Sequence, residues 1–426
     1  MSFDAGITGS RYAFTASDRP VAGSSPAAPP DRACPPEETL ARIRPHFSNL
    51  GITRVGVVTG LDTVGVPVGV AVRPNGLSLS LHQGKGLTEA AALTSAAMEA
   101  VEVALAERAG DHAEEIAPAA LYGGAAPLID LRRLTRCRAR RIDPAVPIAV
   151  SRGVDLVSGG DRSVPTALVS INHTNLIPGD PFDRSSDGLA SGNTAEEAML
   201  HGLLELVERD AVALSRALPA AHLARRRIAP SRFGSEGVDW LADRIGSAGL
   251  ILALFDITGE FGLPVVAAML APADLERRPD LTAASVCGGY ACHPDPARAA
   301  IGAITEACQA RVTGIAGARD DIGGDWYRRA DIGSGPMPGL AALLRANAEA
   351  DPPPPPDIGG DTAARIAGVV ERLAARGFAE AVAVTIPAPP GIHVMRMLAP
   401  GLEIGPGANG RHVGARLLAA MLRTAA

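Results

Sequence analysis

Short β-branched and apolar runs alternate with longer segments of helical periodicity from about residue 50 onward. The runs at 54–58 and 67–72 flank a turn-rich stretch, so they predict a strand pair. Further strands are predicted at 147–150, 167–171, 250–257, 265–270 and 381–386. Helices are predicted near 88–108, 195–215, 236–248, 296–313 and 361–376. The alternation predicts a mixed α/β (α+β) architecture.

The first long helix is apolar nearly all round. Between residues 90 and 106, the polar positions are Thr94, Ser95, Glu99 and Glu102. A helix of this kind is normally buried. Because Ser95, Glu99 and Glu102 are separated by four and then three residues, they share one helix face. Two carboxylates are therefore carried into surroundings of low dielectric constant.

The second and third long helices carry acids in the same way. On the second, spacings of four, four and three align Glu197, His201, Glu205 and Glu208. The third carries Glu306 in an otherwise apolar turn, followed by Gln309 and Arg311. The similar design of the first two acid-bearing helices suggests a pseudo-duplicated fold.

Several buried carboxylates require compensating cations. An isolated buried carboxylate is destabilising or takes up a proton, and hard divalent ions with oxygen ligands are suitable partners for a cluster. Magnesium prefers one or two carboxylates together with substrate phosphates, which extends the prediction to a nucleotide. For any single glutamate, pairing with an arginine or a solvated edge is the more common explanation, but three such helices together favour the metal site. His201 fits a phosphate contact and a satisfied core histidine equally well.

Glycine-rich pieces precede the first two acid-bearing helices. They are Gln83-Gly-Lys-Gly86 and Gly188-Leu-Ala-Ser-Gly-Asn193-Thr. Such glycines let backbone N–H groups approach anions at a helix N-terminus, although ordinary turn formation explains each piece taken alone. The sequence contains neither a G-x-x-x-x-G-K-[ST] motif nor a strand-linked G-x-G-x-x-G motif, so the common phosphate-loop and dinucleotide folds are not supported.

Composition narrows the class of protein. A hydrophobic content of 47% with 20% charged residues is typical of a soluble globular enzyme. A net charge of -6 and an aromatic content of 3% argue against nucleic acid as a partner. No secretory signal is apparent, and Asp256 and Glu260 interrupt the longest apolar region, so a cytoplasmic protein without a membrane partner is expected. The five cysteines form no C-x-x-C pair, which favours free thiols over structural zinc.

The chain is expected to have three parts. Residues 1–36 are rich in Ala, Pro, Ser and Gly and predict a flexible arm without a chemical role. Residues 50–405 hold the predicted catalytic domain, and residues 406–426 form a C-terminal helix or tail. The proline run at 352–356 favours polyproline II in an exposed connection.

An ordered set of motifs over roughly residues 50 to 405 resembles the YcaO family, in which phosphate and magnesium ligands are spread over helices. The early motifs are Gly60-Leu-Asp62, Gln83-Gly-Lys-Gly86 and Ser95-x-x-x-Glu99-x-x-Glu102. The central motifs are Ser186-Asp-Gly-Leu-Ala-Ser-Gly-Asn193-Thr-x-x-Glu197 and Glu205-x-x-Glu208-Arg-Asp210. The late motifs are Gly289-Tyr-Ala-Cys-His-Pro-Asp-Pro296, Glu306-Ala-x-Gln309-Ala-Arg311 and Arg396-Met-x-x-Pro-Gly-Leu-Glu403.

The resemblance implies a YcaO-like fold of pseudo-duplicated sheets, with acid-bearing helices packed around a central nucleotide site, and ATP and Mg²⁺ as cofactors. It implies that ATP is bound by Lys85, Ser95, Glu99, Asn193, Glu197, Gln309 and Arg311. It implies that magnesium is bound by Glu99, Glu102, Glu205, Glu208 and Glu306. The implied reaction is attack of a nucleophile on a backbone amide of a peptide or protein, followed by phosphorylation of the resulting oxyanion by ATP.

Three departures from the family pattern bear on function. Asp187 stands where the family usually has Asn, and Gly302 stands where a longer polar or basic side chain is common. Either change is expected to weaken nucleotide contacts or to alter local hydrogen bonding. The chain ends in Leu422-Arg-Thr-Ala-Ala426 instead of the proline-rich tail of azoline-forming members, which argues against azoline formation.

The nucleophile decides the product. The resemblance is closest to stand-alone members that work with a TfuA-like partner, so thioamide formation with sulfide is the first expectation, and a homodimer is expected from the family. The alternatives are an azoline-forming cyclodehydratase with a separate leader-binding partner, an accessory factor for methylthiolation of a ribosomal protein, and a non-catalytic nucleotide-binding regulator. His82, His201 and His293 each have an ordinary turn or core explanation, so hydrolase chemistry has little support.

Overall fold

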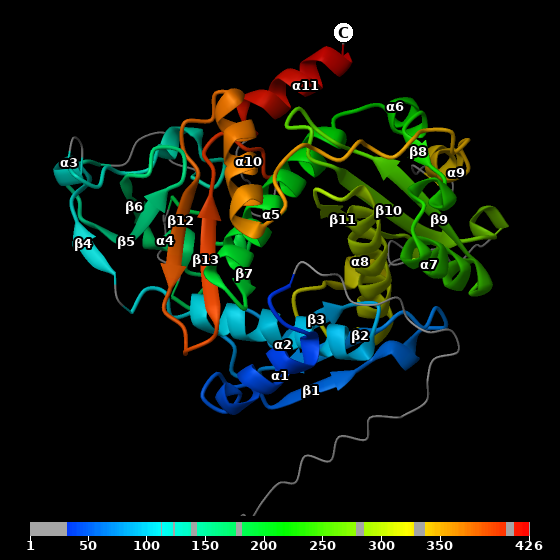
Figure 1. The fold of residues 1–426 in the computed structure, drawn as a ribbon, viewed down its shortest axis with the longest axis horizontal. Helices are drawn as coiled ribbons and strands as arrows, with labels where there is room; N and C mark the ends of the chain where they lie inside the picture. The colour runs from blue at the N-terminus through cyan, green and yellow to red at the C-terminus, as the bar shows by residue number, and fades with distance from the viewer. Residues whose placement is uncertain are drawn as a thin grey trace, which may run out of the picture.

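A computed structural model describes residues 32–111, 113–121, 124–137, 143–175, 181–277, 285–327, 337–405 and 413–425. Three antiparallel sheets surround a set of long helices (Figure 1). Residues 1–31 of the predicted arm and 406–412 of the predicted tail lie outside the described part. The domain boundaries themselves stay predictions.

The helices are α1 Pro36–Ile43, α2 Glu89–Ala106, α3 Pro118–Leu121, α4 Thr166–Val169, α5 Ala195–Ser215, α6 Ala220–Ala224, α7 Glu236–Ser247, α8 Pro296–Ala316, α9 Met337–Leu344, α10 Thr362–Ala375 and α11 Ala415–Ala425. The strands of the first sheet, in the order β1-β2-β3, are β1 Arg54–Val57, β2 Val68–Val72 and β3 Leu81–Lys85. The second sheet follows the order β4-β5-β12-β13-β7, with β6 paired to β5, and contains β4 Glu114–Ile116, β5 Ile148–Asp155, β6 Asp161–Pro165, β7 Leu189–Gly192, β12 Val382–Ile386 and β13 His393–Leu398. The third sheet, in the order β11-β10-β9-β8, contains β8 Arg227–Ile228, β9 Leu250–Asp256, β10 Val265–Pro272 and β11 Cys287–Cys292.

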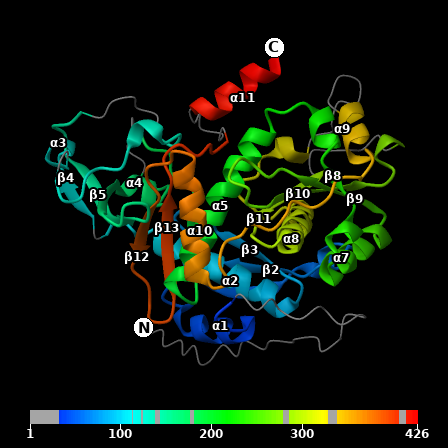
Figure 2. The ribbon, with the colours of Figure 1, turned by 45° about the horizontal axis from the view of Figure 1, so that its top comes forward.

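Three strand-to-helix units form a closed cycle around the centre of the molecule. In each unit, a strand runs into the helix that packs on it: β3 into α2, β7 into α5, and β11 into α8. Each helix also contacts the strand of another unit, because α2 touches β7, α5 touches β11, and α8 touches β3. Figures 1 and 2 both place α2, α5 and α8 inside the molecule, with the sheets around them. The predicted mixed fold is confirmed, and the repeated design extends to three units.

Glycines allow the helices to approach their strands closely. A Cβ atom on Gly84 of β3 would lie 2.0 Å from the backbone nitrogen of Ala96, and one on Gly289 of β11 would lie 2.2 Å from the carbonyl oxygen of Ala303. No side chain fits at either position. Gln83-Gly-Lys is therefore part of a strand on which α2 packs.

Side chains cap the N-termini of the three acid-bearing helices. Thr88 and Thr194 accept hydrogen bonds from backbone N–H groups of the first turns of α2 and α5, and Asp295 does the same for α8. These residue types are the preferred N-caps. The caps fix where each acid-bearing helix begins.

One predicted strand is wrong. The segment predicted as a strand at 167–171 includes the short helix α4, which begins after Pro165 at the end of β6. The carbonyl oxygens of Leu168 and Val169 accept hydrogen bonds from the buried guanidinium groups of Arg136 and Arg396. Because side chains satisfy these carbonyls, the segment needs no neighbouring strand. A short apolar run fits a buried helical turn and a strand equally well.

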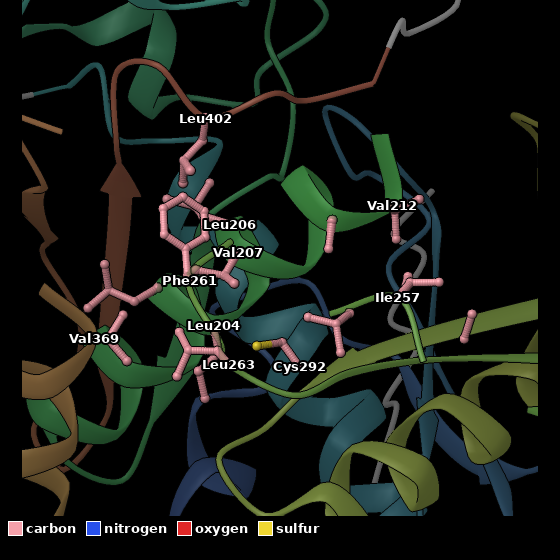
Figure 3. Packing of buried hydrophobic residues seen from close by; sticks show 14 of the residues in the cluster. Leu204, Leu206, Val207, Val212, Ile257, Phe261, Leu263, Cys292, Val369 and Leu402 are labelled. Carbon is pink, nitrogen blue, oxygen red and sulfur yellow. The ribbon is translucent and has the colours of Figure 1, made fainter. Parts of the chain in front are cut away.

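The largest hydrophobic cluster of the described residues joins α5 to side chains of the second and third sheets. Leu204, Leu206 and Val207 of α5 belong to it, together with Phe261 and Cys292 (Figure 3). The cluster covers one side of α5, so the acids of that helix project from the remaining surface. Within the described residues, no helix is both long enough and apolar enough to span a bilayer.

Candidate nucleotide and metal site

Five glutamates from three helices converge at the centre of the helix cycle. They are Glu99 and Glu102 of α2, Glu205 and Glu208 of α5, and Glu306 of α8. The charge of Glu205 acts on Glu99, Glu102 and Glu208, and the charge of Glu306 acts on Glu208. The cycle of helices therefore brings these acids within electrostatic reach of one another.

Burial makes ionisation of this cluster costly. The surrounding protein raises the pKa of Glu208 to about 8 and that of Glu99 to about 7, and neighbouring glutamates add to both effects. The pKa of Glu102 lies well above its usual range, first because of burial and then because of Glu205 and Glu99. Burial also raises the pKa of Glu205. The Glu99 side chain is 39% exposed, so solvent reaches this part of the cluster.

Two cationic side chains offset part of the negative charge. Lys85 Nζ donates a hydrogen bond to Glu306 Oε2 at 2.6 Å. The Arg209 guanidinium lies 3.3 Å from Glu205, 3.6 Å from Glu208 and 3.5 Å from Asp187. One arginine is thus shared by three carboxylates. The arrangement retains excess negative charge that cations can neutralise.

Asp187, expected from the sequence to depart from the family pattern, adds a negative charge beside Glu205 and Arg209. Its carboxylate raises the pKa of Glu205, after the larger effect of burial on that group. The backbone carbonyl of Asp187 accepts a hydrogen bond from the fully buried Arg396 at 2.9 Å. The departure therefore places another acid beside the cluster. Close packing explains the second departure, Gly302. A Cβ atom at this position would lie 2.7 Å from the Cβ of Ala291.

Asn193 and Glu197, both predicted to bind ATP, lie together at the start of α5. Both the backbone N–H and the side-chain amide of Asn193 donate to Glu197 Oε2, at 2.9 and 3.1 Å. Glu197 is buried. These two residues form one hydrogen-bonded group, whose role at ATP stays a prediction.

The other predicted ATP-binding residues occupy different surroundings. Ser95 and Gln309 are half-buried, one turn from Glu99 on α2 and from Glu306 on α8. Arg311 points toward the N-terminal sheet, where its Nε donates to Asp62 Oδ2 at 2.9 Å. Arg311 must leave or share this ion pair in order to contact a nucleotide.

Residues near α1 contact Asn193 and Glu197, and the sequence did not predict these contacts. Thr39 and Arg42 donate to Asn193 Oδ1 at 2.8 and 3.4 Å, and the backbone N–H of Ala33 donates to Glu197. The end of the predicted flexible arm thus contacts the predicted ATP-binding group. Pro36 followed by two glutamates is a helix-start signal that could have identified α1.

A third basic group, Arg319, lies beyond the end of α8. Its charge lowers the pKa of Glu99, although burial raises that pKa more strongly, and its guanidinium pairs with Asp321. No helical periodicity points to Arg319, because it follows Gly317, the residue that ends the helix.

The donor set fits magnesium that bridges protein and phosphate. In the described part of the chain, no three His, Cys, Asp or Glu side chains form a ready-made metal cage. Magnesium does not require one, because it is usually held by one or two carboxylates together with phosphates and water. The predicted metal-binding role of the five glutamates stays a prediction.

Antiparallel sheets and central helices that contribute clustered carboxylates define a class of nucleotide-binding proteins without a phosphate loop. A family model described as "YcaO cyclodehydratase, ATP- and Mg2+-binding" matches residues 83–403. The chain belongs to the YcaO family. That description confirms the predicted cofactors, ATP and Mg²⁺.

Individual relatives agree with this assignment. A Rhizobium leguminosarum bv. trifolii protein, named as an uncharacterized protein in the tfuA 3′ region, is 43% identical, and the match covers 88% of this chain and 89% of that protein. The solved structure of YcaO from Methanopyrus kandleri with AMPPCP and Mg²⁺ has a TM-score of 0.64 at 23% identity, covering 87% of this chain and 92% of that one. A heterocyclase in complex with substrate and cofactor has a TM-score of 0.70 at 22% identity, covering 88% of this chain and 53% of that chain, about half its length. The structural matches show a shared fold.

Proposed function

We propose that this protein uses Mg-ATP to O-phosphorylate a backbone amide of a peptide or protein, and that the product is a thioamide made with a TfuA-like partner. The observation that carries the proposal is the convergence of five glutamates from α2, α5 and α8 beside Lys85 and Arg209. A triphosphate with its cations matches this mixture of excess acid and a few fixed bases.

The chain contributes positioning and charge neutralisation. Magnesium, when bound, would neutralise the phosphates and polarise the phosphoryl group that is transferred. Glu99, Glu102, Glu205, Glu208 and Glu306 would hold the cations, and Lys85 would offset phosphate charge at the edge of β3. Because these side chains are fixed on packed helices, little reorganisation is required when charge develops.

The proposed reaction balances with sulfide as the co-reactant. Hydrosulfide forms a bond to the amide carbon, and the carbonyl electron pair moves onto oxygen. That oxygen attacks the terminal phosphorus of ATP, and ADP leaves. Inorganic phosphate then departs with the former carbonyl oxygen and the C–O electron pair, while the sulfur loses its proton and the C=S bond forms. The net change is amide, sulfide and ATP to thioamide, ADP and phosphate.

The 43% identity to the protein from the tfuA 3′ region supports the thioamide assignment. The family description as a cyclodehydratase favours a second candidate, in which a Cys, Ser or Thr side chain of the substrate attacks the amide. We place the reaction in the cytoplasm, which agrees with five cysteines that form no disulfide. A homodimer stays an expectation, which light scattering of the purified protein tests.

Mass spectrometry of a candidate substrate tests the proposal. The protein is incubated with ATP, magnesium, sulfide and the TfuA-like partner, and Glu205→Gln serves as the inactive control. Replacement of oxygen by sulfur that requires ATP is the expected result. Loss of water would establish cyclodehydration instead, and binding of ATP without any substrate-dependent turnover would contradict an enzymatic role.

A further inference from the structure

His82 is a buried histidine whose two ring nitrogens make no hydrogen bond to the described residues. It is the second residue of β3, and its side chain is 0% exposed. Neither ring nitrogen reaches hydrogen-bond geometry with any residue that the structure describes. The carbonyl of Leu79 lies close enough to raise the pKa of His82 slightly, but outside hydrogen-bond geometry. Buried polar atoms of this kind are uncommon, and each one calls for an explanation.

The ring faces Glu99. His82 Nδ1 lies 3.9 Å from Glu99 Oε1, about 1 Å longer than a normal N–H···O hydrogen bond. Arg73, Glu107 and Arg319 are the other charged groups that act on the ring. Arg73 and Glu107 are already joined by a buried ion pair at 2.7 Å. Glu99 is therefore the acid that is available to accept a hydrogen bond from His82.

The ring is a neutral donor at physiological pH. Burial, followed by the charge of Arg73, lowers the pKa of His82 to about 4. A neutral imidazole carries one N–H, and its partner decides which nitrogen holds that proton. A carboxylate that has lost its own proton to bind a cation favours the proton on Nδ1.

We propose that His82 is a positioning residue for Glu99, and that it donates a hydrogen bond from Nδ1 to this carboxylate when Glu99 holds a cation. The bond closes the present gap of 3.9 Å by a small rotation of the Glu99 side chain, which has the space to move. It fixes which Glu99 oxygen faces the metal, as outer hydrogen bonds do for other metal-binding carboxylates. This inference rests on the proposed function, because it assigns Glu99 to the metal.

His82→Phe separates this role from simple packing. Phenylalanine has a similar shape and removes the unpaired nitrogens, so the thermal midpoint of the nucleotide-free protein is expected to stay the same or to rise. The magnesium concentration that gives half-maximal ATP binding in calorimetry is expected to rise about 10- to 100-fold. His82→Asn, whose amide can replace Nδ1 as a donor, is expected to recover most of that loss.

A matched control is His173→Phe. His173 is exposed and lies near Asp183 and Glu107, away from the glutamate cluster, so its replacement is expected to leave the magnesium dependence unchanged. Wild-type magnesium dependence in His82→Phe would overturn the inference, and so would a loss that His82→Asn fails to recover. If the wild-type protein itself does not bind Mg-ATP, the proposed function fails together with the inference.

Discussion

Lys85 and Glu306 are 221 residues apart in the chain, yet Lys85 Nζ donates to Glu306 Oε2 at 2.6 Å. Lys85 ends β3, and Glu306 lies within α8. The pair joins the first strand-to-helix unit to the third, at the position where the acids of α2 and α5 also converge. It shows how a basic residue from a sheet compensates an acid from a distant helix.

Replacement of Lys85 by Met is expected to weaken ATP binding at least tenfold with little change in stability. Both side chains of the ion pair are more than a quarter exposed, so the pair contributes at most about 1 kcal/mol to folding. The ammonium group has more effect on a triphosphate, whose charge is larger. Calorimetry and thermal denaturation measure the two quantities. Lys85→Arg, which keeps the charge, should recover part of the affinity, and unchanged affinity in Lys85→Met would contradict the assignment.

Glu102→Gln is expected to abolish Mg-ATP binding while raising the thermal midpoint of the nucleotide-free protein. The carboxyl is repelled by Glu205 and Glu99 and disfavoured by burial, and an amide of the same shape removes both effects. With wild-type protein, ATP at 100 times its Kd should add about 2.7 kcal/mol of stability, and EDTA should remove that gain. The variant should show no ATP-dependent change. Wild-type affinity in Glu102→Gln would refute the metal role of this residue.

The stability of the nucleotide-free protein is expected to fall as pH rises from about 6.5 to 8.5. The pKa of Glu208 is raised to about 8 in the folded protein from an ordinary value of 4.5, so up to about pH 8 the folded state holds a proton that the unfolded chain has lost, and it releases that proton above this pH. The buried His82, whose pKa is lowered, has the opposite effect, but that effect is complete once pH exceeds its ordinary pKa of 6.5. Denaturant midpoints across this range measure the slope. Glu208→Gln should flatten the slope, whereas the same slope in that variant would assign the effect to another group.

Affinity for Mg-ATP is expected to change in the opposite direction and to increase over the same pH range. Metal binding requires ionised carboxylates, so it releases the protons held by Glu208 and, to a smaller extent, by the more exposed Glu99. Calorimetry in buffers of different ionisation enthalpy measures that proton release. Binding that is independent of pH and releases no protons would show that these carboxyls do not hold the cation.

Arg416→Ala is expected to destabilise the protein by about 3 kcal/mol. Arg416 of α11 pairs with Asp210, which is 1% exposed and lies two residues after Glu208 on α5. Removal of the guanidinium leaves that buried carboxylate with less compensation. Arg423→Ala changes an exposed arginine of the same helix and should have little effect. Equal effects of the two substitutions in chemical denaturation would contradict this account.

The strands adjoining the acid-bearing helices were the hardest elements to predict. Leu189–Gly192 and Cys287–Cys292 contain glycine and small polar residues, which have low strand propensity. They form strands because β13 and β10 pair with them and because helices press on their glycines. Helices of strong periodicity were predicted more closely, and α5 matches its predicted range at both ends.

The sequence by itself determined which side chains share a helix face, because an α-helix turns once every 3.6 residues whatever surrounds it. Spacings of three and four therefore aligned Glu99 with Glu102 and Glu205 with Glu208, and the threonine caps fixed where those helices begin. Only the tertiary structure decided that the faces meet, that Arg209 serves three carboxylates, and that His82 lies beside Glu99 without a hydrogen bond. Those relationships depend on how sheets and helices far apart in the chain pack together, and local periodicity carries no information about that packing.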